Sequence, residues 1–174
     1  MRLQIVSKGN RTTSATNSII STFLGFLCFQ YRSIFPNLVN HGYGAEVLYV
    51  GDTANKFLHL ESERLKALNF FELSDGELPD VVAYSKQRNW LYLIEAVHSS
   101  GVISPIRLLE LKKLTEECQA DIIFITAFLD RNTFRHFAPD IAWETEVWIA
   151  DAPDHIIHFD GEKFLGPYSP KQSV

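Results

Sequence analysis

The chain has 174 residues, of which 46% are hydrophobic and 21% are charged. This length suits one domain with a single core, and this composition excludes disordered and fibrous proteins. The formal net charge of −5 counts against passive binding of nucleic acid through a basic surface. Two cysteines, Cys28 and Cys118, are too few for a disulfide framework or a thiolate metal site, and they favour a reducing compartment.

The first forty residues predict a polar lead-in and one buried helix. The apolar stretch 19–29 is shorter than the roughly 20 residues that a membrane span requires, and no cleavage signal follows a basic segment. We therefore expect a cytoplasmic protein. One domain is expected over residues 1–174, with a helical N-terminal segment at 1–43 and a loose tail at 168–174.

Strands and a few helices are expected to share the rest of the chain. The expected strands are 45–50, 56–60, two within 78–97 around the polar break 86–89, then 121–128, 143–150 and 155–159. The expected helices are 61–68, a longer one that begins after residue 104, and a short one capped by Asp130. This mixture predicts an α/β (α+β) domain with a mixed β-sheet flanked by helices.

The longer helix has good start signals. Ser104 can cap it, and Pro105 stands where its missing N–H does no harm. Apolar residues then follow at helical spacing up to Cys118. The run 121–128 is apolar and β-prone, which indicates a buried strand, whereas 143–150 alternates as a half-exposed strand should.

Two acidic residues occur in the segment LPDVVAYSKQRNWLYLIEAV. If its strands form a hairpin with the turn centred between Gln87 and Arg88, Asp80 lies directly opposite Glu95. Opposed residues point to one face, with Cβ atoms roughly 5 Å apart. Two carboxylates so placed among apolar neighbours repel each other unless a proton or a cation lies between them. The spacing therefore indicates a site for a hard divalent cation such as Mg²⁺.

The same residues have a simpler interpretation. In this interpretation Asp80, which follows Pro79, simply begins a strand, and Glu95 lies exposed at the end of another. A register shift of one residue would also place the two carboxylates on opposite faces. The spacing alone leaves both interpretations open.

The proline–aspartate pair, the hairpin and the following glutamate resemble the PD-(D/E)XK nuclease superfamily. Longer strings are more specific. AEVLYVGDTANK, LPDVVAY, RNWLYLIEAV, RLLELKKL, ITAFLDRNTF, IAWETEVWIADAPDHIIHFDG and KFLGP resemble, in this order, the BsuBI/PstI restriction endonuclease family. The resemblance covers residues 44–167, most of the chain, and implies a restriction-endonuclease-like fold.

The resemblance also implies an activity and its residues. By position, Asp80, Glu95 and the backbone carbonyl of Ala96 would bind Mg²⁺, and a metal-activated water would hydrolyse DNA. It further implies a Type II enzyme that cuts double-stranded DNA at a specific palindromic site, acts as a homodimer and is paired with a DNA methyltransferase. Family enzymes carry an additional N-terminal helical region, which 1–43 matches poorly, so sequence specificity stays open.

Val97 stands where the superfamily motif has a lysine. Valine neither orients water nor neutralises a phosphate, so another cation replaces it or the enzyme is impaired. On the following helix, Arg107 and Lys112 flank the apolar stripe, whereas Lys113 points away from it. Arg107 is our first candidate because it is nearer in sequence to the acids, and Lys112 is the second. A solvated helix face is the alternative for both.

Three residues are candidates for contacts with DNA. Arg131 and Arg135 lie one helical turn apart and can contact phosphates, with a solvated helix face as the alternative. His98 lies close to a position where the family has a histidine, and its role stays open. His155 and His158 have an HxxH spacing, but on a strand they would point to opposite faces, which disfavours zinc.

Two functions of different classes remain. The first is a Type II restriction endonuclease that depends on Mg²⁺. The second is a non-catalytic DNA-binding or assembly module derived from such an enzyme, which Val97 and the acidic charge favour. Binding of a divalent cation separates the two.

Overall fold

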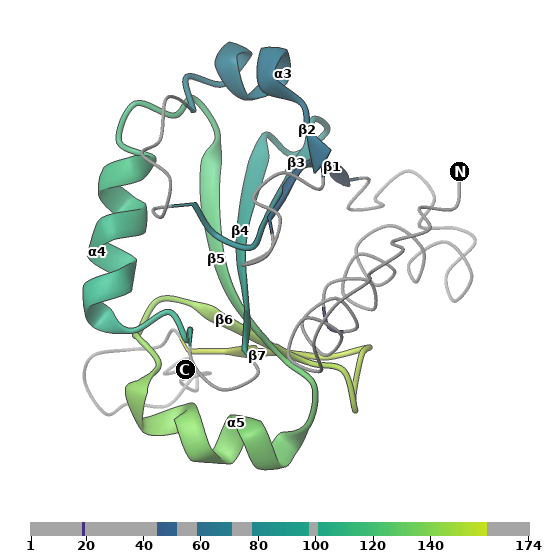
Figure 1. Cartoon of the computed structure of the whole chain (residues 1–174), viewed down its shortest axis with the longest axis vertical. Coiled ribbons are helices and arrows are strands. Elements are labelled where there is room, and N and C mark those ends of the chain that lie inside the picture. Colours follow the sequence, from purple (N-terminus) through teal and green to yellow (C-terminus); the bar gives the residue numbers. More distant parts are fainter. Residues whose placement is uncertain (1–18, 20–44, 52–58, 71–77, 98–100, 160–174) are drawn as a thin grey trace, which may run out of the picture.

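A seven-stranded mixed sheet forms the centre of the computed structural model, which describes residue 19 and residues 45–51, 59–70, 78–97 and 101–159 (Figure 1). The strands are β1 (Ala45–Val50), β2 (His59–Leu60), β3 (Val81–Ser85), β4 (Trp90–Val97), β5 (Asp121–Phe128), β6 (Glu146–Ile149) and β7 (Ile156–His158). Their order in the sheet is β2-β1-β3-β4-β5-β6-β7. The pairs β4–β5 and β5–β6 are parallel and the other neighbours are antiparallel. The expected mixed sheet is confirmed.

Two helices cover one face of this sheet. They are α4 (Pro105–Leu114) and α5 (Arg131–Phe137), and a short helix, α3 (Ser62–Ala67), lies at one end of the sheet in Figure 1. Leu108 and Leu111 of α4 pack with Leu91 and Leu93 of β4. Burial of one such leucine contributes about 1.5–3 kcal/mol. Within the described residues, no helix is long and apolar enough to cross a membrane.

Helix α5 packs farther along the same face. Its residues Phe134 and Phe137 contact a buried cluster that includes Val97 of β4 and Phe128 of β5. A 3₁₀ turn, η3 (Ala138–Asp140), follows α5 directly. The face therefore carries two apolar clusters, one under α4 and one under α5.

The opposite face of the sheet has a cluster of its own. Ile94 and Ala96 of β4 contribute to it, together with Ile125 of β5, the fully buried Trp148 of β6, and Ile19 from the N-terminal segment. Because successive side chains of a strand point to opposite faces, Glu95 points to the face that α4 and α5 cover.

The β3–β4 hairpin has the predicted register. Val81 opposes Ile94 and Ser85 opposes Trp90, as a turn centred between Gln87 and Arg88 requires. The predicted helix caps are also confirmed: Ser104 accepts a hydrogen bond from the backbone N–H of Arg107, and Asp130 from that of Thr133.

Two expectations about elements need correction. The predicted strand 143–150 is shorter, and β6 is not half-exposed, because Val147, Trp148 and Ile149 are all buried. This strand lies between β5 and β7, with clusters on both faces, so both sets of its side chains are covered. Helix α4 ends at Leu114, so Cys118 lies beyond it as a free, half-buried thiol.

The second strand is expected over 56–60. His59 and Leu60 form β2, and residues 56–58 lie outside the described residues. Predictions for Cys28, His98, residues 168–174 and, apart from Ile19, residues 1–43 lie outside the described residues.

Candidate active site

Asp80 and Glu95 meet in the middle of the sheet. Asp80 immediately precedes β3, and the hairpin register, continued by one residue, places it opposite Glu95 of the central strand β4. The Oδ2 atom of Asp80 accepts a hydrogen bond of 2.8 Å from the backbone N–H of Ala96, so its carboxylate reaches β4. Glu95 is only 8% exposed, which excludes the interpretation of an exposed residue at a strand end.

The end of β1 fixes the backbone of Asp80. The N–H of Gly51 donates a hydrogen bond of 2.8 Å to the carbonyl of Asp80. A Cβ atom at position 51 would overlap the hydroxyl of Tyr49, which is itself buried. Glycine at position 51 therefore leaves room for the Tyr49 side chain, while its N–H holds the backbone of Asp80.

Burial and a neighbouring charge shift the ionisation of Glu95. Burial, and then the negative charge of Asp80, raises the pKa of Glu95 from 4.5 to about 7. The charge and hydrogen bond of Arg107 act in the opposite direction without cancelling this rise. The two acids therefore form a site where a positive charge is favoured, as the spacing predicted.

Arg107 supplies a positive charge from the first turn of α4. Its Nε donates a hydrogen bond of 2.9 Å to Oε1 of Glu95, and its Nη2 lies 2.8 Å from the same oxygen. Burial disfavours its charged form, but attraction and hydrogen bonds to Glu95 and Glu110 outweigh this and raise the pKa of Arg107. The predicted placement of Arg107 beside the acids is thus confirmed.

Two further acceptors hold the guanidinium group. Nη1 of Arg107 donates to Oε2 of Glu110 at 3.1 Å, and Nη2 donates to the backbone carbonyl of Leu78 at 3.3 Å. The sequence analysis missed both partners. Glu110 follows Arg107 by three residues, a spacing at which helix side chains meet, whereas nothing in the sequence points to the Leu78 carbonyl.

Thr126 is a second residue that the sequence analysis missed. It is fully buried on β5 directly beside Glu95 in the parallel register. Its hydroxyl accepts a hydrogen bond of 3.3 Å from the N–H of Ile103, which immediately precedes the cap residue Ser104. Thr126 thereby ties the start of α4 to the strand that neighbours Glu95. A polar residue in the apolar run 121–128 was the available signal.

Val97 lies on the same face as Glu95 but in apolar surroundings. Its side chain is fully buried with Phe128, Ile141, Val147 and Ile149. The residue at the position of the superfamily lysine therefore belongs to the core under α5.

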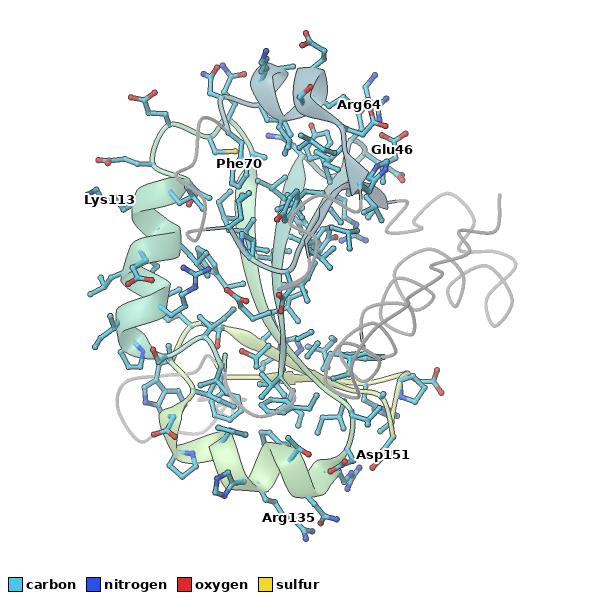
Figure 2. All side chains as sticks on the ribbon, in the orientation of Figure 1. Glu46, Arg64, Phe70, Lys113, Arg135 and Asp151 are labelled. Carbon is cyan, nitrogen blue, oxygen red and sulfur yellow. The ribbon has the colours of Figure 1, made fainter. Side chains whose placement is uncertain are left out.

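The second candidate cation lies elsewhere on α4. Lys112 forms an ion pair with Glu144 at 3.7 Å, and both side chains are exposed. Lys113 projects from α4 away from the sheet, as expected (Figure 2). Of the two candidates, Arg107 is the one with a described contact to Glu95.

The candidate DNA-binding residues lie on the outer surface of α5. Arg131 and Arg135 are both exposed, and Arg135 points away from the sheet in Figure 2. The backbone N–H of Arg131 donates to Oδ2 of Asp151 at 3.3 Å.

The donor set suits one kind of cation. No group of three or more His, Cys, Asp or Glu side chains gathers in the part of the chain that the structure describes, so His155 and His158 form no such cluster. Asp80 is half-buried and Glu95 is buried, on the face of the sheet that α4 covers. Mg²⁺ is typically bound through one or two carboxylates, with water and substrate phosphates completing its shell. The pair therefore fits Mg²⁺ and does not fit an all-protein zinc site.

Comparison with known proteins gives consistent matches. The family model of the BsuBI/PstI restriction endonuclease domain matches residues 33–162. The Type II restriction enzyme BsuBI of Bacillus subtilis is 45% identical over 125 residues, covering 72% of this chain and 40% of that protein. The Type II restriction enzyme AplI of Arthrospira platensis is 31% identical over 129 residues, covering 69% of this chain and 39% of that protein.

A solved structure supports the same match. The SdaI restriction endonuclease has a TM-score of 0.73 and 35% sequence identity to this chain, and the likeness covers 89% of this chain and 46% of that one. The expected restriction-endonuclease-like fold is thereby confirmed. The chain spans less than half the length of each of these relatives.

The raised pKa of Glu95 predicts how stability depends on pH. In the metal-free protein the pKa is about 7 when folded and 4.5 when unfolded, so the folded state binds this proton more tightly. Its contribution to stability is complete below pH 4.5 and is lost as the pH rises to about 7. The loss is on the order of 3 kcal/mol. Glu95→Gln has no such proton, so its free energy of unfolding should lack this fall.

Urea unfolding of both proteins in EDTA, at several pH values between 4.5 and 7.5, measures the difference. Other titrating groups cancel in the comparison. Equal pH dependence of the two proteins would show that Glu95 ionises normally.

Proposed function

Because the chain belongs to the BsuBI/PstI restriction endonuclease family, we propose that it hydrolyses phosphodiester bonds of double-stranded DNA as a Type II restriction endonuclease. The observation that carries this proposal is the pairing of half-buried Asp80 with buried Glu95, with Arg107 beside them. The relatives BsuBI and AplI are named Type II restriction enzymes and SdaI is named a restriction endonuclease, which supports the proposal. A palindromic site, a homodimer, a partner DNA methyltransferase and a cytoplasmic location are further parts of the proposal.

Asp80, Glu95 and Ala96 are the proposed ligands of Mg²⁺. Oδ2 of Asp80 accepts a hydrogen bond from the N–H of Ala96, so this carboxylate lies beside the Ala96 backbone. In an extended strand the N–H and C=O of one residue point toward the same neighbouring strand, so the Ala96 carbonyl faces the side of Asp80. Bound there, the cation would supply a water of lowered pKa and offset charge on the phosphate.

Arg107 is the proposed electrostatic residue. A guanidinium stays charged at neutral pH and so cannot act as a general base. Its planar set of N–H donors suits phosphate oxygens. We therefore assign it stabilisation of the charge that develops on the phosphate in the transition state, with Lys112 as the second choice.

Contacts with the DNA backbone are assigned to exposed residues. Arg131 and Arg135 of α5 are proposed to contact phosphates, which would fix the position of DNA without reading its sequence. His98 is retained as a third candidate, although it lies outside the described residues.

A catalytically impaired module is the alternative function. The apolar burial of Val97 favours it, because the superfamily lysine has no counterpart on β4. A calorimetric titration with Mn²⁺ separates the two proposals: binding that Asp80→Asn removes supports the nuclease, and no binding to the unaltered protein supports the module.

Removal of either acid should abolish cleavage. Asp80→Ala and Glu95→Ala each delete a proposed ligand, so Mg²⁺-dependent cleavage of plasmid DNA should disappear while far-UV circular dichroism stays unchanged. Glu63→Ala on α3 is the matched control, because this exposed acid lies on another element. Cleavage that persists in EDTA would contradict the proposal, since no other nucleophile than metal-activated water is invoked.

Arg107 and Lys112 can be separated by parallel substitutions. Arg107→Ala should lower kcat by about 10²–10³, the usual effect of losing one such transition-state contact, whereas Lys112→Ala should lower it by less than about threefold. Both rates are measured at saturating Mg²⁺, and thermal unfolding shows whether each variant is folded. The reverse order of effects would make Lys112 the functional cation.

A further inference from the structure

We propose that Glu110 is a positioning residue, which keeps Arg107 beside the acids when a cation occupies the carboxylate of Glu95. This inference rests on the proposed function, because it concerns the same site. Nothing in the sequence motif marks Glu110, and its assignment comes from its contact with Arg107.

The guanidinium group of Arg107 has four described polar contacts. Two of them, at 2.9 and 2.8 Å, end on Oε1 of Glu95. The third ends on Oε2 of Glu110 at 3.1 Å and the fourth on the carbonyl of Leu78 at 3.3 Å. One side chain is thus held from β4, from its own helix and from the segment that leads into β3.

A cation at Glu95 would disturb half of these contacts. The oxygen that accepts both short contacts from Arg107 belongs to a proposed metal ligand, so cation and guanidinium compete for it. Two like charges also repel each other strongly in a poorly hydrated site. Of these described contacts, Arg107 would then keep those to Glu110 and the Leu78 carbonyl. Glu110 is the charged partner of the two and forms the stronger bond.

Exposure separates this role from a role in stability. The side chain of Glu110 is 56% exposed, whereas that of Arg107 is 19% exposed. An exposed ion pair at i,i+3 spacing adds little to folding. Glu110 therefore determines where Arg107 lies once a cation binds Glu95. The stability of the fold does not depend on Glu110.

Helix α3 offers a matched control for the spacing. Glu63 and Lys66 form an exposed i,i+3 ion pair at 3.5 Å, with no described contact to the acids. Glu63→Ala removes an ion pair of the same i,i+3 spacing as Glu110→Ala does, with acid and base in the opposite order. Any effect that only Glu110→Ala shows is therefore specific to Arg107.

The first test follows the side chain of Arg107 without measuring activity. In ¹⁵N-labelled protein, the Nε–H signal of Arg107 is assigned by its loss in Arg107→Lys. We expect this signal in the metal-free unaltered protein, and at a new position in saturating Mg²⁺. In Glu110→Ala the signal should be present without metal and lost with Mg²⁺, whereas Glu63→Ala should behave as the unaltered protein does.

The outcomes of this test are distinct. If Mg²⁺ moves the signal and Glu110→Ala retains it, the positioning role is wrong and the metal site stands. If Mg²⁺ leaves the signal of the unaltered protein unmoved and Mn²⁺ does not bind in calorimetry, the metal site fails and the positioning role fails with it.

The second test is a double-mutant cycle on DNA cleavage. Glu110→Ala should lower kcat about tenfold at saturating Mg²⁺ with little change in KM, because the lost alignment acts in the transition state. Glu110→Gln keeps an acceptor oxygen and should recover most of the rate. In the Arg107→Ala background, Glu110→Ala should have no further effect, since it acts through Arg107. Multiplicative effects of the two substitutions would overturn the proposal.

Discussion

Two carboxylates held side by side in a buried part of a sheet are the constraint on which this structure depends. The hairpin register sets Asp80 opposite Glu95, and burial and mutual repulsion together raise the pKa of Glu95 to about 7. Such an arrangement is unfavourable unless a proton or a positive charge compensates it. Arg107 provides that charge in the metal-free fold. The same repulsion that makes the pair costly to fold also makes it a good ligand set for a divalent cation.

The position of Arg107 depends in turn on how helix α4 begins. Ser104 and Pro105 define its first turn, and the buried hydroxyl of Thr126 anchors the preceding N–H of Ile103 to β5. Because β5 pairs in parallel with β4, this anchor lies beside Glu95. The helix is thus tied to the site at the end from which Arg107 extends, and Leu108 and Leu111 pack the rest of it against the sheet.

Much of this arrangement could be predicted from local patterns. The opposition of Asp80 and Glu95 followed from an assumed turn centred between Gln87 and Arg88, and the structure has that register. The apolar stripe of α4 showed which side of the helix faces the sheet, and Arg107 flanks that stripe. Thr126, Glu110 and the Leu78 carbonyl were not predicted, because their roles depend on which elements become neighbours. The exposure of β6 was wrongly predicted for the same reason: alternation in one strand does not show whether helices or other segments cover both faces.

Val97 shows why the compensating charge comes from a helix. A lysine at this position would extend from a site surrounded by Phe128, Ile141 and Val147. Burial of a charged group there is costly unless the charge is fully paired. Its ammonium would have to compete for Glu95 with a guanidinium that already contacts Oε1 twice. An arginine on α4 instead contacts Glu95 from the helix, where Glu110 and a backbone carbonyl share its N–H groups. Because the helix carries the positive charge beside Glu95, position 97 of β4 can belong to the apolar core under α5.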